Sequence, residues 1–434
     1  MRRTLLLAAL GAALALGTSV SAASSESPSF AAAKSYETGA GSAAVAVGDL
    51  NGDGRPDLAT ANYIAASVSV LLNNGDVTFQ PKHDYGTGVG PVSVAINDLN
   101  ADGRPDVVTA NLWDDTVSVL LNTGDGTFAT AHDYDTGGSP FDVAVRDLNG
   151  DGSPDLVTAD DETSTVSVLF NGGDGTFDSR QDYETGAGPD AVVAGDLNGD
   201  GLPDLATANG ASSSVSVLLN TGAGRFDRRD YETGGDFPSL AIGDLNGDGK
   251  PDLVSTGAEG LFVLLNGGGG TFRSKGHAGY WSRIEIADLN GDGAPDLVAS
   301  GVSVLLNRGN GSFAAGADYP GGGAVAIGDL NGDGRPDVVT ASSDYETGAG
   351  TVSLLINTPG LCNVQEVGGE YGSPRTLAAA KRILARGHCR VGKVRRAFNR
   401  YVRKGLVISQ KPEFGAVLPG GGKVNLVISK GKRR

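Results

Sequence analysis

Asp49-Leu50-Asn51-Gly52-Asp53-Gly54-Arg55-Pro56-Asp57 is one of seven near-identical nonapeptides in this chain of 434 residues. The copies begin at Asp49, Asp98, Asp147, Asp196, Asp244, Asp288 and Asp329 and are spaced 49, 49, 49, 48, 44 and 41 residues apart. Only the second copy departs at the fourth position, where Ala101 replaces Gly. A period of 40 to 50 residues indicates one structural unit that is repeated along the chain.

Strand patterns flank each nonapeptide. Before the first copy, Val45 and Val47 alternate with small residues, and after it come the short segment 57–60 and the β-branched run 67–73. A Gly-rich turn then leads to Phe79 and to the segment 84–88, which contains Tyr85. Period two is typical of strands. Four short antiparallel strands in every repeat predict the blades of a β-propeller.

The strand count predicts how the ring closes. After the first six nonapeptides, the outer strand is marked by a Phe, namely Phe79, Phe128, Phe177, Phe226, Phe272 and Phe313. The seventh unit ends at Asn357 without such a strand, whereas Phe30 and Tyr36 stand unmatched near the N-terminus. We therefore expect residues 30–39 to be the outer strand of the seventh blade, because closure removes unpaired strand edges. The predicted fold class is mainly β, a seven-bladed propeller closed by an N-terminal strand.

The nonapeptide has the ligand chemistry of a calcium loop. Calcium takes six to eight oxygen ligands, and the side chains at positions 1, 3, 5 and 9, with the carbonyl at position 7, can supply five of them. Gly54 permits a left-handed turn. The predicted ligands of about seven Ca²⁺ ions are Asp49, Asn51, Asp53, Arg55 and Asp57; Asp98, Asn100, Asp102, Arg104 and Asp106; Asp147, Asn149, Asp151, Ser153 and Asp155; Asp196, Asn198, Asp200, Leu202 and Asp204; Asp244, Asn246, Asp248, Lys250 and Asp252; Asp288, Asn290, Asp292, Ala294 and Asp296; and Asp329, Asn331, Asp333, Arg335 and Asp337.

Two other readings of the nonapeptide bear on this prediction. An EF-hand needs Glu at position 12, which is occupied here by Thr, Ser or Ala, and needs flanking helices where this sequence predicts strands. A turn held by Asp and Asn side chains without metal remains an alternative. The prediction of a calcium site is weakest for the second loop, because Ala101 tolerates left-handed backbone angles less well than Gly.

The loops and the Leu-Leu-Asn-x-Gly-x-Gly-x-Phe element that follows them resemble FG-GAP repeats of the VCBS type. The resemblance covers residues 30–357. Such repeats form the propeller of integrin α-subunits and of many secreted bacterial proteins. The resemblance implies calcium between the first and second strands of each blade, and a role in ligand binding or adhesion rather than catalysis.

Charge and composition divide the chain into three parts. Residues 1–22 have paired Arg, the apolar run 5–16 and a small-residue cleavage site, which predict a signal peptide; an uncleaved anchor is the alternative. Residues 23–360 carry 15 Lys/Arg and 48 Asp/Glu, whereas residues 361–434 carry 17 Lys/Arg and 3 Asp/Glu. We therefore expect a propeller domain over 23–360, a basic domain over 361–434, and a secreted, extracellular or cell-wall location.

The basic domain shows a small α+β pattern. A helix is expected between Pro374 and Gly387, followed by strands at 391–394, 406–408 and 424–428. The segments 405–415 and 424–431 resemble a PASTA domain, which implies peptidoglycan binding through residues 362–430; a solubilising or propeller-docking module is the alternative. Cys362 and Cys389 are the only two Cys, so export predicts a disulfide between them.

Motifs for catalysis and for nucleic-acid binding were sought in the same way. The sequence contains no nucleophile elbow, phosphate loop or zinc motif, and the acidic propeller repels nucleic acid. We therefore predict a binding protein with an unknown protein or glycan ligand on one propeller face, without enzymatic activity. The alternative is an extracellular polysaccharide-active enzyme of lyase type, using the irregular cluster His277, Tyr280, Trp281 and Arg283. Glu285 also departs from the Ala or Val of other first strands.

Overall fold

The computed structural model describes most of the repeat region and parts of the C-terminal domain. The described residues are 28–31, 33–177, 179–222, 224–233, 239–257, 260–277, 283–358, 362–363, 376–377, 379–381, 390–399, 401–411, 417–418, 423–430 and 432. The predicted signal peptide, Tyr280, Trp281 and Cys389 lie outside these residues, so the structure leaves the disulfide a prediction. Among the described residues, no helix is long and apolar enough to cross a membrane.

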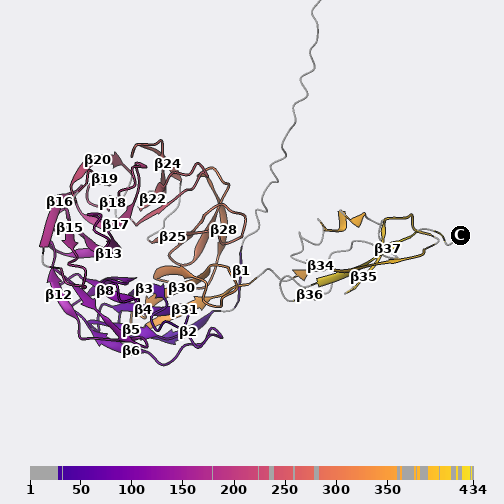
Figure 1. Ribbon diagram of the computed structural model, residues 1–434, viewed down its shortest axis with the longest axis horizontal. Helices are drawn as coiled ribbons and strands as arrows, with labels where there is room; N and C mark the ends of the chain where they lie inside the picture. Colours follow the sequence, from indigo (N-terminus) through magenta and orange to yellow (C-terminus); the bar gives the residue numbers. More distant parts are fainter. Residues whose placement is uncertain are drawn as a thin grey trace, which may run out of the picture.

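The described residues of the repeat region form seven four-stranded antiparallel sheets arranged around a central axis (Figure 1). The first sheet contains β3 (Ser42–Gly48), β4 (Asp57–Asn62), β5 (Ser67–Leu71) and β6 (His83–Gly86). The second contains β7 (Pro91–Asn97), β8 (Asp106–Asn111), β9 (Thr116–Leu120) and β12 (His132–Asp135), with a small hairpin of β10 (Asn122–Gly124) and β11 (Thr127–Phe128). The third contains β13 (Pro140–Arg146), β14 (Asp155–Asp160), β15 (Thr165–Phe170) and β16 (Ser179–Glu184).

The next three sheets repeat this order of strands. The fourth contains β17 (Pro189–Gly195), β18 (Asp204–Asn209), β19 (Ser214–Asn220) and β20 (Phe226–Glu232). The fifth contains β21 (Leu240–Gly243), β22 (Asp252–Gly257), β23 (Gly260–Asn266) and β24 (Phe272–His277). The sixth contains β25 (Ile284–Ala287), β26 (Asp296–Ala299), β27 (Ser303–Asn307) and β28 (Phe313–Asp318).

The seventh sheet combines the two ends of the repeat region. It contains β29 (Ala324–Gly328), β30 (Asp337–Ser343), β31 (Gly350–Leu355) and, as its outer strand, β2 (Lys34–Glu37). Beside it, β1 (Ser29–Phe30) pairs with β32 (Asn357–Thr358), so that Phe30 lies opposite Asn357 as Phe128 lies opposite Asn122 in the second sheet. The prediction that the N-terminal segment supplies the missing outer strand is confirmed.

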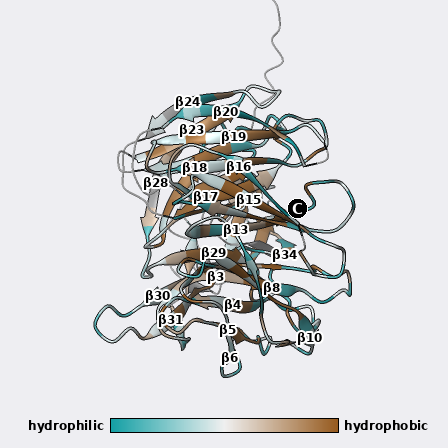
Figure 2. Cartoon of the chain, turned by 90° about the vertical axis from the view of Figure 1, so that its left-hand side faces the viewer, coloured by the Kyte–Doolittle hydropathy of each residue, from teal (hydrophilic) through white to brown (hydrophobic). Residues whose placement is uncertain are grey.

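Burial explains why the middle strands are rich in apolar residues. The second strand of the first sheet, β4, is buried along its whole length, whereas the outer strand β6 is largely exposed. The buried apolar positions of β4 are interspersed with buried Asp57, Thr60 and Asn62, whose side chains are hydrogen-bonded. In Figure 2, hydrophobic colour follows the strands and the connections are largely hydrophilic.

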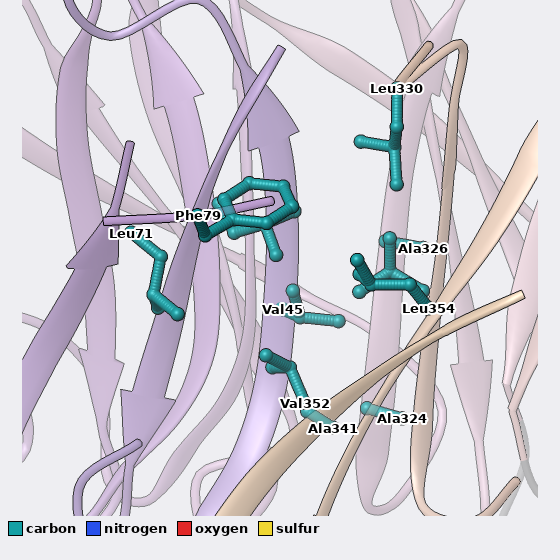
Figure 3. Close-up of a cluster of buried hydrophobic side chains, with 11 residues drawn as sticks. Val45, Leu71, Phe79, Ala324, Ala326, Leu330, Ala341, Val352 and Leu354 are labelled. Carbon is teal, nitrogen blue, oxygen red and sulfur yellow. The ribbon is translucent and has the colours of Figure 1, made fainter. Parts of the chain in front are cut away.

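The first strand of each sheet is innermost and contacts the first strand of the next sheet. These contacts link β3, β7, β13, β17, β21, β25 and β29, and β29 in turn contacts β3. At this last junction, Val45 and Phe79 of the first unit share a core cluster with Leu330, Val352 and Leu354 of the seventh (Figure 3). The ring of contacts therefore includes the pair of sheets that lie farthest apart in the sequence.

The described residues of the C-terminal domain form a three-stranded sheet and a two-stranded sheet, with helical residues at 377 and 379–381. Its strands are β33 (Cys362–Asn363), β34 (Arg390–Ala397), β35 (Val407–Lys411), β36 (Val417–Leu418) and β37 (Lys423–Ser429). The central strand β37 runs parallel to β34 and antiparallel to β35. The three predicted strands are confirmed, although each is longer than expected.

Candidate metal centres and the opposite face

Each predicted metal loop connects the first and second strands of its sheet. In the first sheet the loop leaves β3 at Asp49 and enters β4 at Asp57. Leu50 is buried and anchors the loop to the core. The seven loops therefore lie at the same end of the seven sheets, which we call the metal face.

Hydrogen bonds from the loop's own backbone hold the acidic side chains in place. The Asp49 carboxylate accepts N–H groups of Gly52 at 2.8 Å and Gly54 at 2.7 Å, and Asn51 Oδ1 accepts the N–H of Asp53 at 2.9 Å. Gly54 has a φ of 81°, the left-handed turn that was predicted for it. The loop is thus folded by its own side chains.

Position 9 of the loop has a structural role that the sequence did not reveal. The fully buried Asp57 carboxylate accepts the N–H of Leu50 at 2.9 Å and the N–H of Asn73 at 2.7 Å. Burial raises the pKa of Asp57 to about 6, these two hydrogen bonds oppose the shift, and the nearby charges of Asp53 and Asp49 add to it. Asp57 therefore joins the metal loop to the third strand while lying near the other loop carboxylates.

In the first two loops, the Arg side chain at position 7 makes a second connection between the loop and the Asn just after the end of the third strand. Arg104 pairs with Asp102 at 2.6 Å and donates from Nε to the Asn122 carbonyl at 3.3 Å. Arg55 makes the same contacts with Asp53 and with the Asn73 carbonyl. Both Arg side chains are about half exposed, so the ion pairs contribute little stability.

The donor set of each loop fits calcium, because three carboxylates, one amide oxygen and backbone carbonyls are all hard oxygen ligands. As the side chains stand, no three His, Cys, Asp or Glu residues in the described part of the chain are gathered closely enough to hold a metal ion together. The position 9 carboxylate turns toward backbone N–H groups instead. The structure thus brings all 35 predicted positions into seven equivalent loops.

A buried Asn at or just after the end of the third strand bonds each sheet to the loop of the preceding sheet. Asn122 Nδ2 donates to the Leu50 carbonyl at 2.8 Å, and Asn73 Nδ2 donates to the Leu330 carbonyl at 3.0 Å. The other members of the set are Asn171, Asn220, Asn266, Asn307 and Asn357, with bonds of 2.7 to 2.9 Å. The bond from Asn73 crosses the junction between the first and seventh sheets.

The face opposite the metal loops exposes large apolar side chains. Trp113 lies between β8 and β9 and Ile64 between β4 and β5, and both are 62% exposed. Trp113 Nε1 donates to Tyr63 Oη at 2.7 Å, so the two aromatic residues form one patch across two sheets. We call Tyr63, Ile64 and Trp113 the aromatic patch. The sequence did not predict this patch, because Tyr63 and Trp113 lie in different connections, 50 residues apart in the chain.

The irregular cluster that the enzyme alternative requires is divided between strands. His277 ends the outer strand β24, whereas Arg283 immediately precedes the innermost strand β25. Arg283 and Glu285 instead line a central cavity with Asp142 and Asp190. The sequence interpretation identified Glu285 as unusual, but it missed the two Asp residues, whose departure from small residues at their strand positions was visible.

Comparisons with known proteins agree with this architecture. A model of the FG-GAP-like repeat matches residues 49–109, 98–158, 147–207, 196–255, 244–299 and 288–340, and a PASTA domain model matches residues 374–430. No curated protein matches the chain. Each FG-GAP-like match runs from one metal loop to position 12 of the next, so all seven loops are included.

Solved structures match the chain at low sequence identity, and the BBS1N structure shares its fold. BBS1N in complex with ARL6DN, soaked with mercury, is 12% identical with a TM-score of 0.54, covering 75% of this chain and 97% of that chain. An Agrocybe aegerita lectin, described as recognising non-reducing terminal N-acetylglucosamine, is 25% identical with a TM-score of 0.49, covering 75% and 86%. From the repeat matches, which span well over half of its length, the chain belongs to the FG-GAP-like repeat family, and a PASTA domain follows its repeats.

Proposed function

We propose that this protein is a secreted, calcium-binding propeller of the bacterial cell surface that binds a protein or glycan ligand. The aromatic patch is the observation that carries the binding role. Exposed Trp and Tyr side chains combine apolar area with a hydrogen-bonding group and are enriched at interfaces. A patch of exposed large apolar residues on a folded surface marks an interaction site.

Calcium has a supporting role in this proposal. Each loop concentrates three Asp, and their mutual repulsion falls when a divalent cation lies among them. Ion binding requires the side chains at positions 1, 3, 5 and 9 to turn toward one centre, while the loop backbone keeps the left-handed turn at Gly54. Calcium bound at the metal face then stabilises the folded sheets, and the opposite face remains accessible to the ligand.

The PASTA match supports attachment to peptidoglycan through residues 362–430. The signal peptide predicted at residues 1–22 and the PASTA match both support a location outside the cell. Cosedimentation with purified peptidoglycan is expected for the chain from residue 23 onward and not for a chain that ends at residue 360. Equal sedimentation of the two chains would contradict attachment through the C-terminal domain.

A screen of glycans and cell-wall fragments, with and without calcium, tests the binding role. We expect the screen to identify a ligand. The double variant Trp113→Ala/Ile64→Ala should no longer bind this ligand, because it lacks the two most exposed apolar side chains of the aromatic patch. Glu162→Ala is the matched control, since Glu162 occupies the equivalent connection of the third sheet, between β14 and β15. Unchanged binding by the double variant would remove the aromatic patch from the proposal.

A further inference from the structure

The inner strands enclose a central cavity of about 570 Å³. Its lining includes Ser42 at the start of β3 and Ser343 at the end of β30, so it lies toward the face opposite the metal loops. Pockets of roughly 300 to 1,000 Å³ bind small molecules. The cavity therefore has the size of a small-molecule site, separate from the loops and from the aromatic patch.

One of its acidic residues, Asp142, is fully engaged in holding sheets together. Its carboxylate accepts the Ser93 hydroxyl at 2.7 Å, its own neighbour Val143 N–H at 3.0 Å and the Val192 N–H at 3.0 Å. These bonds connect the second, third and fourth sheets. Burial raises the pKa of Asp142, and the hydrogen bonds from Val192, Ser93 and Val143 and the charge of Arg283 oppose that shift.

The other two acidic residues, Glu285 and Asp190, have no hydrogen bond or ion pair with any described residue. The neighbouring cation Arg283 donates to the Val92 carbonyl on the second sheet at 3.4 Å. Three carboxyl groups thus share one guanidinium, which leaves the cavity acidic. Glu285 is exposed to the cavity and Asp190 is partly buried, so a ligand that enters the cavity can supply the partners that these carboxyl groups lack.

The register of the inner strands shows that Glu285 is not needed for packing. It lies opposite Val298, which is position 11 of the sixth repeat. At the same register the other sheets carry Ala46, Ala95, Ala144, Val193, Ala241 and Ala326. A carboxylate among small apolar side chains projects into space that the other sheets leave open.

The protein environment disfavours the charged forms of both free carboxyl groups. Burial raises the pKa of Glu285 to about 7, with a further increase from Asp142 and a decrease from Arg283. Burial also raises the pKa of Asp190 to about 7, and Asp161 adds to that shift. A cation placed beside these groups would stabilise their ionised forms.

We propose that the central cavity binds a small organic cation with a primary ammonium group, which pairs with the free carboxyl groups that line the cavity, Glu285 and Asp190. An ammonium has three N–H donors that can reach acceptors on separate strands. Free amines, the side chain of a peptide Lys and amino sugars share this ammonium chemistry.

Titration calorimetry on the chain from residue 23 onward, loaded with calcium at about 0.15 M salt to screen weak contacts, tests the proposal. The probes are 1,5-diaminopentane, Nα-acetyl-lysine amide and glucosamine, with 1,5-pentanediol as the uncharged match. At least one amine is expected to bind saturably at one site, and the diol is not. The probe that binds most tightly shows whether the natural ligand is a free amine, a peptide Lys side chain or an amino sugar.

Glu285→Ala introduces the residue that five other sheets carry and should fold normally; Glu285→Gln keeps the side-chain volume. Each variant, and Asp190→Ala, should weaken amine binding at least about tenfold, because a charge-assisted hydrogen bond is lost. Glu184→Ala removes an exposed carboxylate from the outer strand β16 and should bind like the unaltered protein. The proposal is overturned if no amine binds better than the diol, if the cavity variants bind normally, or if Mg²⁺ competes with the amine at equal affinity.

Discussion

Two backbone positions in each metal loop, the fourth and the sixth, take the left-handed conformation that side chains disfavour. Position 4 is Gly with φ of 76° at Gly52, and the same conformation is imposed on Ala101, with φ of 56°. A non-glycine residue in this region costs about 1 kcal/mol or more. The second loop therefore carries a strain that the other six avoid.

Ala101→Gly should stabilise the protein by about 1 kcal/mol, because glycine adopts the angle without a steric penalty. No atom outside its immediate chain neighbours lies within 4 Å of an added Cβ at Gly52, so Gly52→Ala isolates the same backbone effect with the opposite sign. Denaturant unfolding in calcium buffer measures both. Equal unfolding free energies for Ala101→Gly and the unaltered protein would show that the loop relieves the strain elsewhere.

A single acidic residue in the third sheet makes stability depend on pH. Asp160 occupies the position of Asn62 and Asn111, and its buried carboxyl accepts hydroxyl groups of Thr158 at 2.7 Å and Ser167 at 2.6 Å. Burial raises the pKa of Asp160 from 3.8 to about 6. The folded chain thus binds this proton more tightly than the unfolded chain, so stability falls as the pH rises from about 4 through 6.

Asp160→Asn should remove the fall in stability between about pH 4 and pH 6, because Asn does not titrate. Above pH 6 the variant is expected to be more stable by up to about 3 kcal/mol, and near pH 4 the two proteins should converge, because Asn resembles the protonated acid. Asn111→Asp is the reverse control and should lose stability above pH 6. Thermal melting between pH 4 and 8 measures both; a constant difference across that range would contradict the titration of Asp160.

At the scale of elements, the N-terminal strand joins the two ends of the ring. The Tyr36 ring packs edge-on against Phe79 of the first unit at 5.4 Å, and Phe30 packs against Tyr319 of the sixth at 4.7 Å. The same Tyr–Phe contact joins other neighbouring sheets, as between Tyr85 and Phe128. The segment thus contacts the sheets on both sides of the seventh.

Removing residues 23–40 should expose the edge of β31, lower the melting temperature and promote aggregation, because an unpaired strand edge pairs with other chains. The matched control removes only residues 23–27, since the Pro28 carbonyl accepts the Tyr319 hydroxyl. Light scattering and thermal melting distinguish the outcomes. If the longer deletion stays monomeric and melts like the control, β2 is not needed to close the ring.

At the scale of the whole molecule, repetition made the fold predictable. Seven nonapeptides with strand patterns on both sides indicated the sheets, and the surplus Phe30 and Tyr36 indicated the closing strand. The bond from Asn122 to the Leu50 carbonyl, and the meeting of Asp190 with Glu285 in one cavity, were not predicted. Each joins residues on different sheets, and strand periodicity carries no information about contacts between sheets.

The metal loops link neighbouring sheets around the whole ring. Each sheet is bonded to the preceding loop through its buried Asn, so a change in one loop reaches the neighbouring sheet. Ions that bind only the folded state stabilise it by mass action, by about 2.7 kcal/mol for each site at one hundred times its dissociation constant. Calcium at several loops should therefore contribute a large share of the stability of the ring.

The most direct test is the calorimetric melting temperature of the chain from residue 23 onward, measured in excess Ca²⁺ and in excess calcium chelator. We predict a fall of about 10 °C or more on chelation, because several sites lose their ion together, and full recovery when Ca²⁺ is restored. Asp49→Asn combined with Asp53→Asn, which disables one loop, should reduce this difference. An identical melting temperature with and without the chelator would contradict the calcium-binding propeller.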